Sequence, residues 1–228
     1  MNKLLLIIVS LIFIQQDFES ELDRLRKLGA TICQTDEGVF AFASPIGTHR
    51  NEAWRGNAND INELVRFAGL VSIELELTPN IIPVFDDFDQ EFSLRKFSLH
   101  CVGELNEKVV GSIGRMRTLK KLELIAHAFP NFSLSNLSDL DALEELRLAG
   151  KGFPKVNLEL LATFENLRTV DLTGIGTLGF EDLETLPDIP NLEAITLIVV
   201  EADLERAKQI LRNKYRDVVL ELFSESDE

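Results

Sequence analysis

Cysteine, tryptophan, tyrosine and positively charged residues are all scarce in this sequence. Two cysteines in 228 residues, Cys33 and Cys101, allow at most one disulfide and exclude a disulfide scaffold. The chain has 23 Lys and Arg residues against 38 Asp and Glu residues, which gives a net charge of −15. This balance argues against binding to nucleic acid and against docking on anionic lipid, because both need a surface rich in Lys and Arg.

Motifs of common catalytic sites are also missing. The sequence contains no G-x-S-x-G, no P-loop, no G-x-G-x-x-G after a strand and no H-E-x-x-H. Its only histidines are His49, His100 and His127. We therefore predict a protein that is not an enzyme and needs no cofactor. The alternative is an enzyme with a site in the cap region, around His49 and the Pro79–Glu91 segment.

What the sequence does contain is typical of a globular protein. Hydrophobic residues make up 45% of the chain and charged residues 27%, which argues against disorder. A chain of this length buries roughly 70% of its extended surface on folding. A stable core is therefore expected without a disulfide or a structural metal ion.

The first 16 residues form a separate segment. Lys3 is followed by an eleven-residue apolar run, Leu4–Ile14, and then by the polar Gln15 and Gln16. This layout predicts a signal peptide, or another N-terminal apolar leader, over residues 1–16. A helix of this length rises about 16 Å, well short of the roughly 30 Å hydrocarbon core, so no membrane span is expected.

Two locations follow from the two interpretations of this leader. A signal peptide predicts an exported protein of the periplasm, the cell envelope or the extracellular space. No small residues follow the apolar run at the place of a cleavage site, however. The alternative is a buried N-terminal strand or helix in a cytoplasmic protein.

A period of 24–25 residues organises residues 61–200. The pattern apolar-x-x-apolar-x-apolar occurs six times, and successive copies begin 24, 25, 24, 24 and 25 residues apart. Each copy has the alternation of a strand with one buried face, and the constant period predicts strands stacked in parallel. The six triplets are Leu70/Ile73/Leu75, Leu94/Phe97/Leu99, Leu119/Leu122/Leu124, Leu143/Leu146/Leu148, Leu167/Val170/Leu172 and Leu192/Ile195/Leu197.

Apolar residues at every third position precede five of these strands. Ile61, Leu64 and Phe67, for example, lead into the first strand. This spacing predicts a short helix or a 3₁₀ turn with one inward stripe. Each unit is then strand, turn, short helix and turn, and neighbouring units share a core that one unit cannot bury alone. The segment Pro79–Gln90 does not fit the helical pattern and is predicted to be a loop.

These repeats resemble the leucine-rich repeat family over residues 61–200. The resemblance implies a right-handed α/β solenoid, with parallel strands on its concave face and short helices on its convex face. The family usually has Asn or Cys in the turn after the strand. In this sequence the corresponding residues are Thr78, Val102, His127, Lys151, Ile175 and Val200. The chain is therefore interpreted as a divergent member, similar to the short bacterial proteins of the family.

Residues 17–60 are predicted to cap the first repeat. A helix is expected over Asp17–Leu28, and Gly29 is suited to end it. A β-hairpin with its turn at Thr35–Gly38 follows and would cover the open edge of the first repeat strand. Trp54, the sole tryptophan, is expected to anchor this cap on the repeats.

Residues 201–228 are predicted to cap the last repeat. Asp203–Tyr215 has the pattern of an amphipathic helix, and Val218–Phe223 has that of a final strand. A short acidic tail completes the chain. The expected organisation is thus one repeat domain with a helix–hairpin cap before it and a helix–strand cap after it.

Strand positions between the apolar residues are expected to point away from the core, onto the concave face. Stacked repeats bind their partners on such extended surfaces. We therefore predict a module that binds a protein partner by shape and charge complementarity. A structural envelope component with no discrete ligand is the alternative. The candidate binding residues are Glu74, Glu76, Lys96, Ser98, His100, Lys121, Glu123, Glu145, Arg147, Thr169, Asp171 and Thr173.

A metal site is not predicted. His100, Cys101 and His127 lie on adjacent expected strands, and His and Cys side chains bind zinc. Cys101 lies between two outward positions, however, so it should point into the core, opposite to His100. The acidic run Asp86–Glu91 does not match a calcium loop, because the positions that require Gly and Glu hold other residues.

Overall fold

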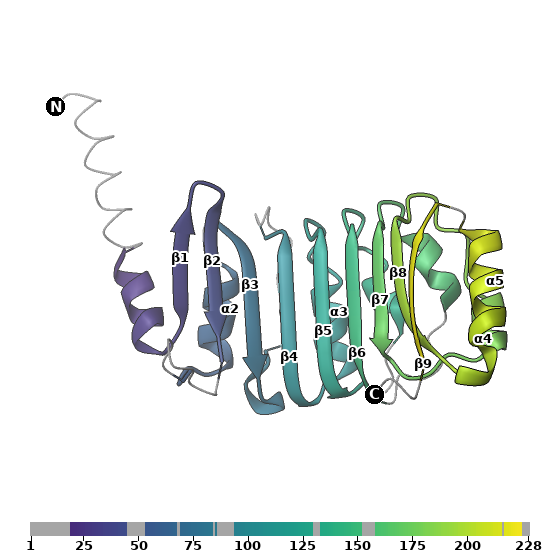
Figure 1. Cartoon of the computed structure of the whole chain (residues 1–228). Helices are drawn as coiled ribbons and strands as arrows, with labels where there is room; N and C mark the ends of the chain where they lie inside the picture. Colours follow the sequence, from purple (N-terminus) through teal and green to yellow (C-terminus); the bar gives the residue numbers. More distant parts are fainter. Residues whose placement is uncertain are drawn as a thin grey trace, which may run out of the picture.

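A computed structural model describes residues 19–44, 53–67, 69–83, 85, 94–129, 133–151, 158–215 and 217–224. Its main element is a nine-stranded sheet in which the strand order, β1 to β9, follows the chain order (Figure 1). Strands β1 and β2 pair antiparallel, and each later pair of neighbours is parallel. The predicted α/β class is therefore confirmed as one mostly parallel sheet with short helices.

Strands alternate with short helices or 3₁₀ turns along much of the described chain. The strands are β1 (Thr31–Thr35), β2 (Gly38–Ala43), β3 (Leu70–Leu77), β4 (Lys96–Glu104), β5 (Lys121–Ala128), β6 (Glu145–Lys151), β7 (Thr169–Gly174), β8 (Ala194–Val199) and β9 (Val219–Ser224). The labelled helices are α2 (Ala58–Val65), α3 (Glu107–Ile113), α4 (Phe180–Glu184) and α5 (Leu204–Lys214). The 3₁₀ turns are η1 (Pro79–Ile81), η2 (Leu134–Leu137), η3 (Leu158–Thr163) and η4 (Glu201–Asp203). Residues 19–27 are also helical.

The core lies between the sheet and the layer of short helices. All residues of the six apolar triplets are buried, and the most accessible of them, Leu192, is 8% exposed. Equivalent residues of successive strands are register partners, as in the row Leu75, Leu99, Leu124 and Leu148. The apolar residues at every third position before the strands are buried as well. The predicted core is confirmed, and it leaves the opposite sheet face to polar side chains.

Side chains in the turns before the strands connect neighbouring units. Asn166 Nδ2 donates to the Asp141 carbonyl at 2.7 Å, and Asn191 Nδ2 donates to the Glu165 carbonyl at 2.8 Å. Each bond joins a residue to one in the preceding unit. Both asparagines lie in the turns that precede the strands.

Sheet pairing continues from the N-terminal hairpin into the repeats. Thr35 pairs with Gly38 across the predicted turn, and β2 pairs in parallel with β3. Gly29 ends the first helix with φ at +100°, a conformation that favours glycine. Trp54 is 5% exposed and belongs to the core, which agrees with its predicted role as a packing residue.

The C-terminal segment has the predicted helix and strand. α5 and β9 each lie within a residue of the expected bounds. Lys214 Nζ and the Tyr215 hydroxyl donate to the carbonyl oxygens of Leu186 and Pro187, respectively. These two bonds attach the end of α5 to the preceding unit.

Ionisation of Tyr215 is expected to destabilise the fold at alkaline pH. Burial raises the pKa of Tyr215 from its ordinary value of 10.0 to about 12, and the charge of Asp188 acts in the same direction. The unfolded chain loses this proton at a lower pH than the folded chain, so the contribution to stability is complete below pH 10 and lost between about pH 10 and 12. The expected loss is about 2 to 3 kcal/mol.

The measurement is urea unfolding over this pH range, with Tyr215→Phe as the variant that lacks this dependence. Tyr215 is the only tyrosine of the chain, so the ultraviolet absorbance of phenolate reports its ionisation alone. A phenolate midpoint near pH 10 in the folded protein would contradict the prediction.

Several predictions made from the sequence concern residues that the structure does not describe. The leader over 1–16, His49, the acidic run Asp86–Glu91 and the last four residues of the tail lie outside the described residues. Of the predicted loop Pro79–Gln90, the described part starts with the 3₁₀ turn η1 and includes Phe85, which packs edge-on against Phe97 at 5.5 Å between ring centroids. Among the described residues we find no helix with the length and hydrophobicity needed to cross a bilayer.

Candidate binding face of the sheet

Alternation along the strands places the predicted binding residues on one face. We call this the outward face, the side of the sheet opposite the core. In β4, Lys96, Ser98 and His100 are accessible to solvent, while Phe97 and Leu99 between them are buried. The same alternation holds in β3 and β5. In-register parallel pairing then lines up the outward side chains of successive strands in rows.

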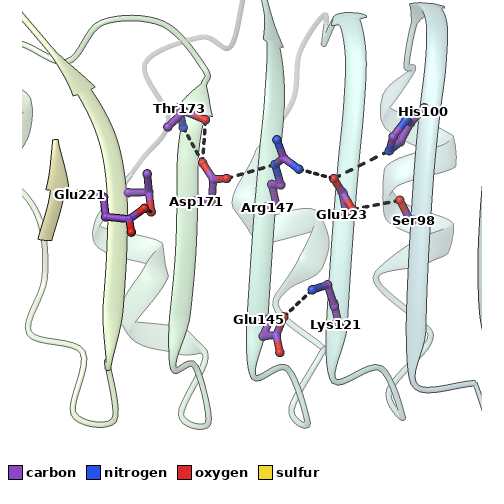
Figure 2. Close-up of polar contacts among 10 residues, drawn as sticks. Ser98, His100, Lys121, Glu123, Glu145, Arg147, Asp171, Thr173 and Glu221 are labelled. Atoms are coloured by element: carbon purple, nitrogen blue, oxygen red, sulfur yellow. Dashed lines mark hydrogen bonds and ion pairs between the residues drawn. The ribbon is translucent and has the colours of Figure 1, made fainter. Parts of the chain in front are cut away.

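A chain of polar contacts crosses the middle of the outward face (Figure 2). Arg147 on β6 donates from Nη1 to Glu123 Oε1 on β5 at 2.8 Å, and its Nε lies 3.1 Å from Asp171 Oδ2 on β7. Glu123 Oε2 also accepts a hydrogen bond from Ser98 at 3.2 Å. Asp171 Oδ1 accepts from the Thr173 hydroxyl at 2.7 Å. Contacts along this row therefore link side chains of four neighbouring strands.

Two further polar pairs of this face are separate from this chain of contacts. Lys121 Nζ donates to Glu145 Oε2 at 2.7 Å, between β5 and β6. The Thr196 hydroxyl donates to Glu221 Oε2 at 3.4 Å, between β8 and β9. Thr169 is a register partner of Glu145 and of Ala194, and within the described chain its side chain has no hydrogen bond.

At the N-terminal end of the outward face, the charged side chains of β3 and β4 are arranged differently. Glu76 on β3 is the register partner of His100 on β4, and Glu74 lies one outward position earlier on β3. Glu76 Oε2 accepts a hydrogen bond from the buried Ser44 at 2.6 Å. Lys96 is exposed and forms no ion pair with any residue that the structure describes.

Ion pairs on this face fix side-chain positions more than they stabilise the fold. Arg147 is about half exposed, and so are Lys121 and Glu145. Exposed pairs of this kind contribute roughly 0 to 1 kcal/mol each, because solvent screens them and because two long side chains lose freedom. Their main effect is to hold charged groups of both signs in a defined pattern.

The predicted orientation of Cys101 is confirmed. Its side chain is buried, and burial raises the pKa of the thiol, which keeps the group protonated and unreactive. His100 is on the opposite face, so the two side chains do not share an ion. Both cysteines are free.

Some features of this face did not follow from the sequence. Ser44 follows β2 and Glu221 lies in β9, and both belong to segments predicted to be caps, so the repeat pattern does not extend the rows to them. Ile198 follows Leu197, so strict alternation would place it on the outward face, but it is 7% exposed and is a register partner of Phe223. The neighbouring strand β9 contributes this partner. Because the repeat pattern ends before β9, the pattern alone does not predict the pairing.

No family model matches the chain, and no curated protein matches it either.

Proposed function

We propose that the protein is a non-catalytic module that binds a protein partner through the outward face of a right-handed leucine-rich repeat solenoid. The repeat period of 24–25 residues, the parallel pairing of β2 to β9 and the alternation of strands with short helices support this architecture. In such a solenoid the outward face is concave and accessible to a large partner.

The observation that carries the proposal is the ordered polar pattern of this face. Glu123, Arg147 and Asp171 hold one another across three strands, so these side chains lose little freedom when a partner binds. The pattern is also asymmetric. Glu74 has no basic partner among the described residues, whereas Glu123, Glu145 and Asp171 pair with Lys121 or Arg147. A complementary partner presents basic groups toward β3 and polar groups of both signs toward β5 to β7.

The test uses exchange of charges within one ion pair. The double variant Lys121→Glu with Glu145→Lys keeps the pair and the net charge, yet reverses the pattern presented to a partner. Its matched control is Glu205→Lys with Lys208→Glu, the same exchange in the α5 pair at 2.7 Å, away from the outward face. Tagged full-length chain and both variants serve as baits in extracts of the native host.

We expect one protein to be enriched by the unmodified chain and by the control, and to bind the exchanged variant at least tenfold more weakly when measured with purified partners. The remaining affinity should fall with added salt, because the discriminating contacts are charged. Equal capture by all baits would contradict the assignment to the outward face. Absence of any enriched protein would contradict the proposed function.

A further inference from the structure

Glu74, Glu76 and His100 place three metal-binding groups together at the N-terminal end of the outward face. A carboxylate oxygen of each glutamate and a ring nitrogen of His100 all lie within 4.8 Å of one another. The in-register pairing of β3 and β4 produces this arrangement, since it sets Glu76 directly opposite His100. Zinc binds imidazole nitrogen and carboxylate oxygen at roughly 2.0 to 2.2 Å, so three such atoms gathered in one place are suited to hold a single ion.

Neither glutamate forms an ion pair with a residue that the structure describes. Glu123, Glu145 and Asp171 each contact Arg or Lys, whereas no basic side chain of the described chain pairs with Glu74 or Glu76. Two carboxylates that project from one strand on the same side repel each other. A cation held between them removes this repulsion.

Neighbouring polar residues contact Glu76 and His100 and can orient them, as the residues around a metal site orient its ligands. The hydroxyl of Ser44, which is 2% exposed, donates to Glu76 Oε2 and so orients that carboxylate. His100 Nε2 is inaccessible to solvent, makes no hydrogen bond to any described residue, and lies 3.8 Å from Glu123 Oε1. A histidine that binds a metal through one ring nitrogen usually donates the other N–H to a carboxylate. Glu123, held in turn by Arg147 and Ser98, is the carboxylate within reach.

We propose that Glu74, Glu76 and His100 bind one divalent transition-metal ion of the zinc type. One imidazole nitrogen and two carboxylate oxygens suit zinc and its neighbours, whereas calcium and magnesium prefer oxygen ligands alone. Three protein ligands leave a fourth position, which is open to water or to a side chain of a partner. This inference stands independently of the proposed partner binding, because a metal ion can bind the isolated chain.

The first test is titration of the chelator-treated full-length chain with zinc chloride, followed by calorimetry. All samples carry Cys33→Ser, which removes the exposed thiol as a competing zinc ligand. We expect one zinc ion per chain, and at least tenfold weaker binding in His100→Gln and in Glu76→Gln. The controls His127→Gln and Glu205→Gln, which alter exposed residues outside the cluster, should leave zinc affinity unchanged.

The second test separates ligation from damage to the fold. Ser44→Ala leaves all three ligands in place and removes only the orienting hydroxyl, so we expect zinc affinity to fall by about tenfold without a change in stoichiometry. Thermal unfolding of each variant without zinc identifies any loss of structure. Absence of stoichiometric binding, or binding that His100→Gln and Glu76→Gln both retain in folded form, would overturn the proposal.

Discussion

Replacing Leu124 with alanine is expected to lower the free energy of unfolding by about 3 to 4 kcal/mol. Leu124 lies at the centre of the sheet on β5, is fully buried, and is the register partner of Leu99 on one side and Leu148 on the other. Hydrogen bonds on both sides of β5 fix the strand positions, so neighbouring strands cannot close around the space left by the missing atoms. The loss therefore includes a cavity in addition to the lost transfer free energy.

The matched control is Ile125→Ala at the next position of the same strand. Ile125 is half-buried on the outward face, so the expected loss is at most about 1 kcal/mol. Urea unfolding followed by circular dichroism measures both values. Similar losses for the two variants would show that the strand does not direct alternate residues to the core and to the outward face.

Replacing Gly114 with alanine is expected to cost about 3 kcal/mol, at the upper end of the range for overpacking. Gly114 follows α3, and a Cβ at this position would lie 1.9 Å from the carbonyl oxygen of Asn136 in η2. The opposing atom belongs to the backbone, so no side-chain rotation relieves the contact. Two successive units of the helical layer would have to move apart, and the core beneath them would lose packing.

Gly111, inside α3, provides a control for which the expected change in stability has the opposite sign. A Cβ at Gly111 would meet no atom within 4 Å, and the residue lies inside α3. Gly111→Ala should therefore increase stability by about 0.5 to 1 kcal/mol, since alanine loses less conformational freedom in a helix. Calorimetric unfolding of the two variants should shift the transition in opposite directions. A downward shift of equal size in both would contradict the close contact at Gly114.

The main elements were predictable because each depends on a local pattern. Ile73, Phe97 and Leu122 occupy equivalent positions of successive units, and one spacing rule predicts that each is buried and that they lie side by side. The hairpin was predictable for a similar reason, because a single glycine at the turn, Gly38, lies between two alternating segments.

The contacts within the candidate site were less predictable. Sequence placed Glu74, Glu76 and His100 on the outward face, but their approach to one another depends on side-chain rotamers. Ser44, which follows β2 in the predicted cap, reaches Glu76 across 32 positions of sequence. The side chain of Asn166 bonds to the preceding unit, and no spacing rule in the sequence predicts this contact. Such contacts are set by the stacking of units and have no local signature.

The order of the strands along the chain has a consequence for how this protein can vary. Each strand pairs only with its neighbours in sequence, so a whole unit can be inserted or removed while the pairing rules of the others stay the same. Such a change adds one strand to the outward face or removes one, which alters its length by about 4.8 Å. Selection can therefore adjust the reach of this surface in discrete steps while the two ends, with Ser44 and Tyr215, stay unaltered.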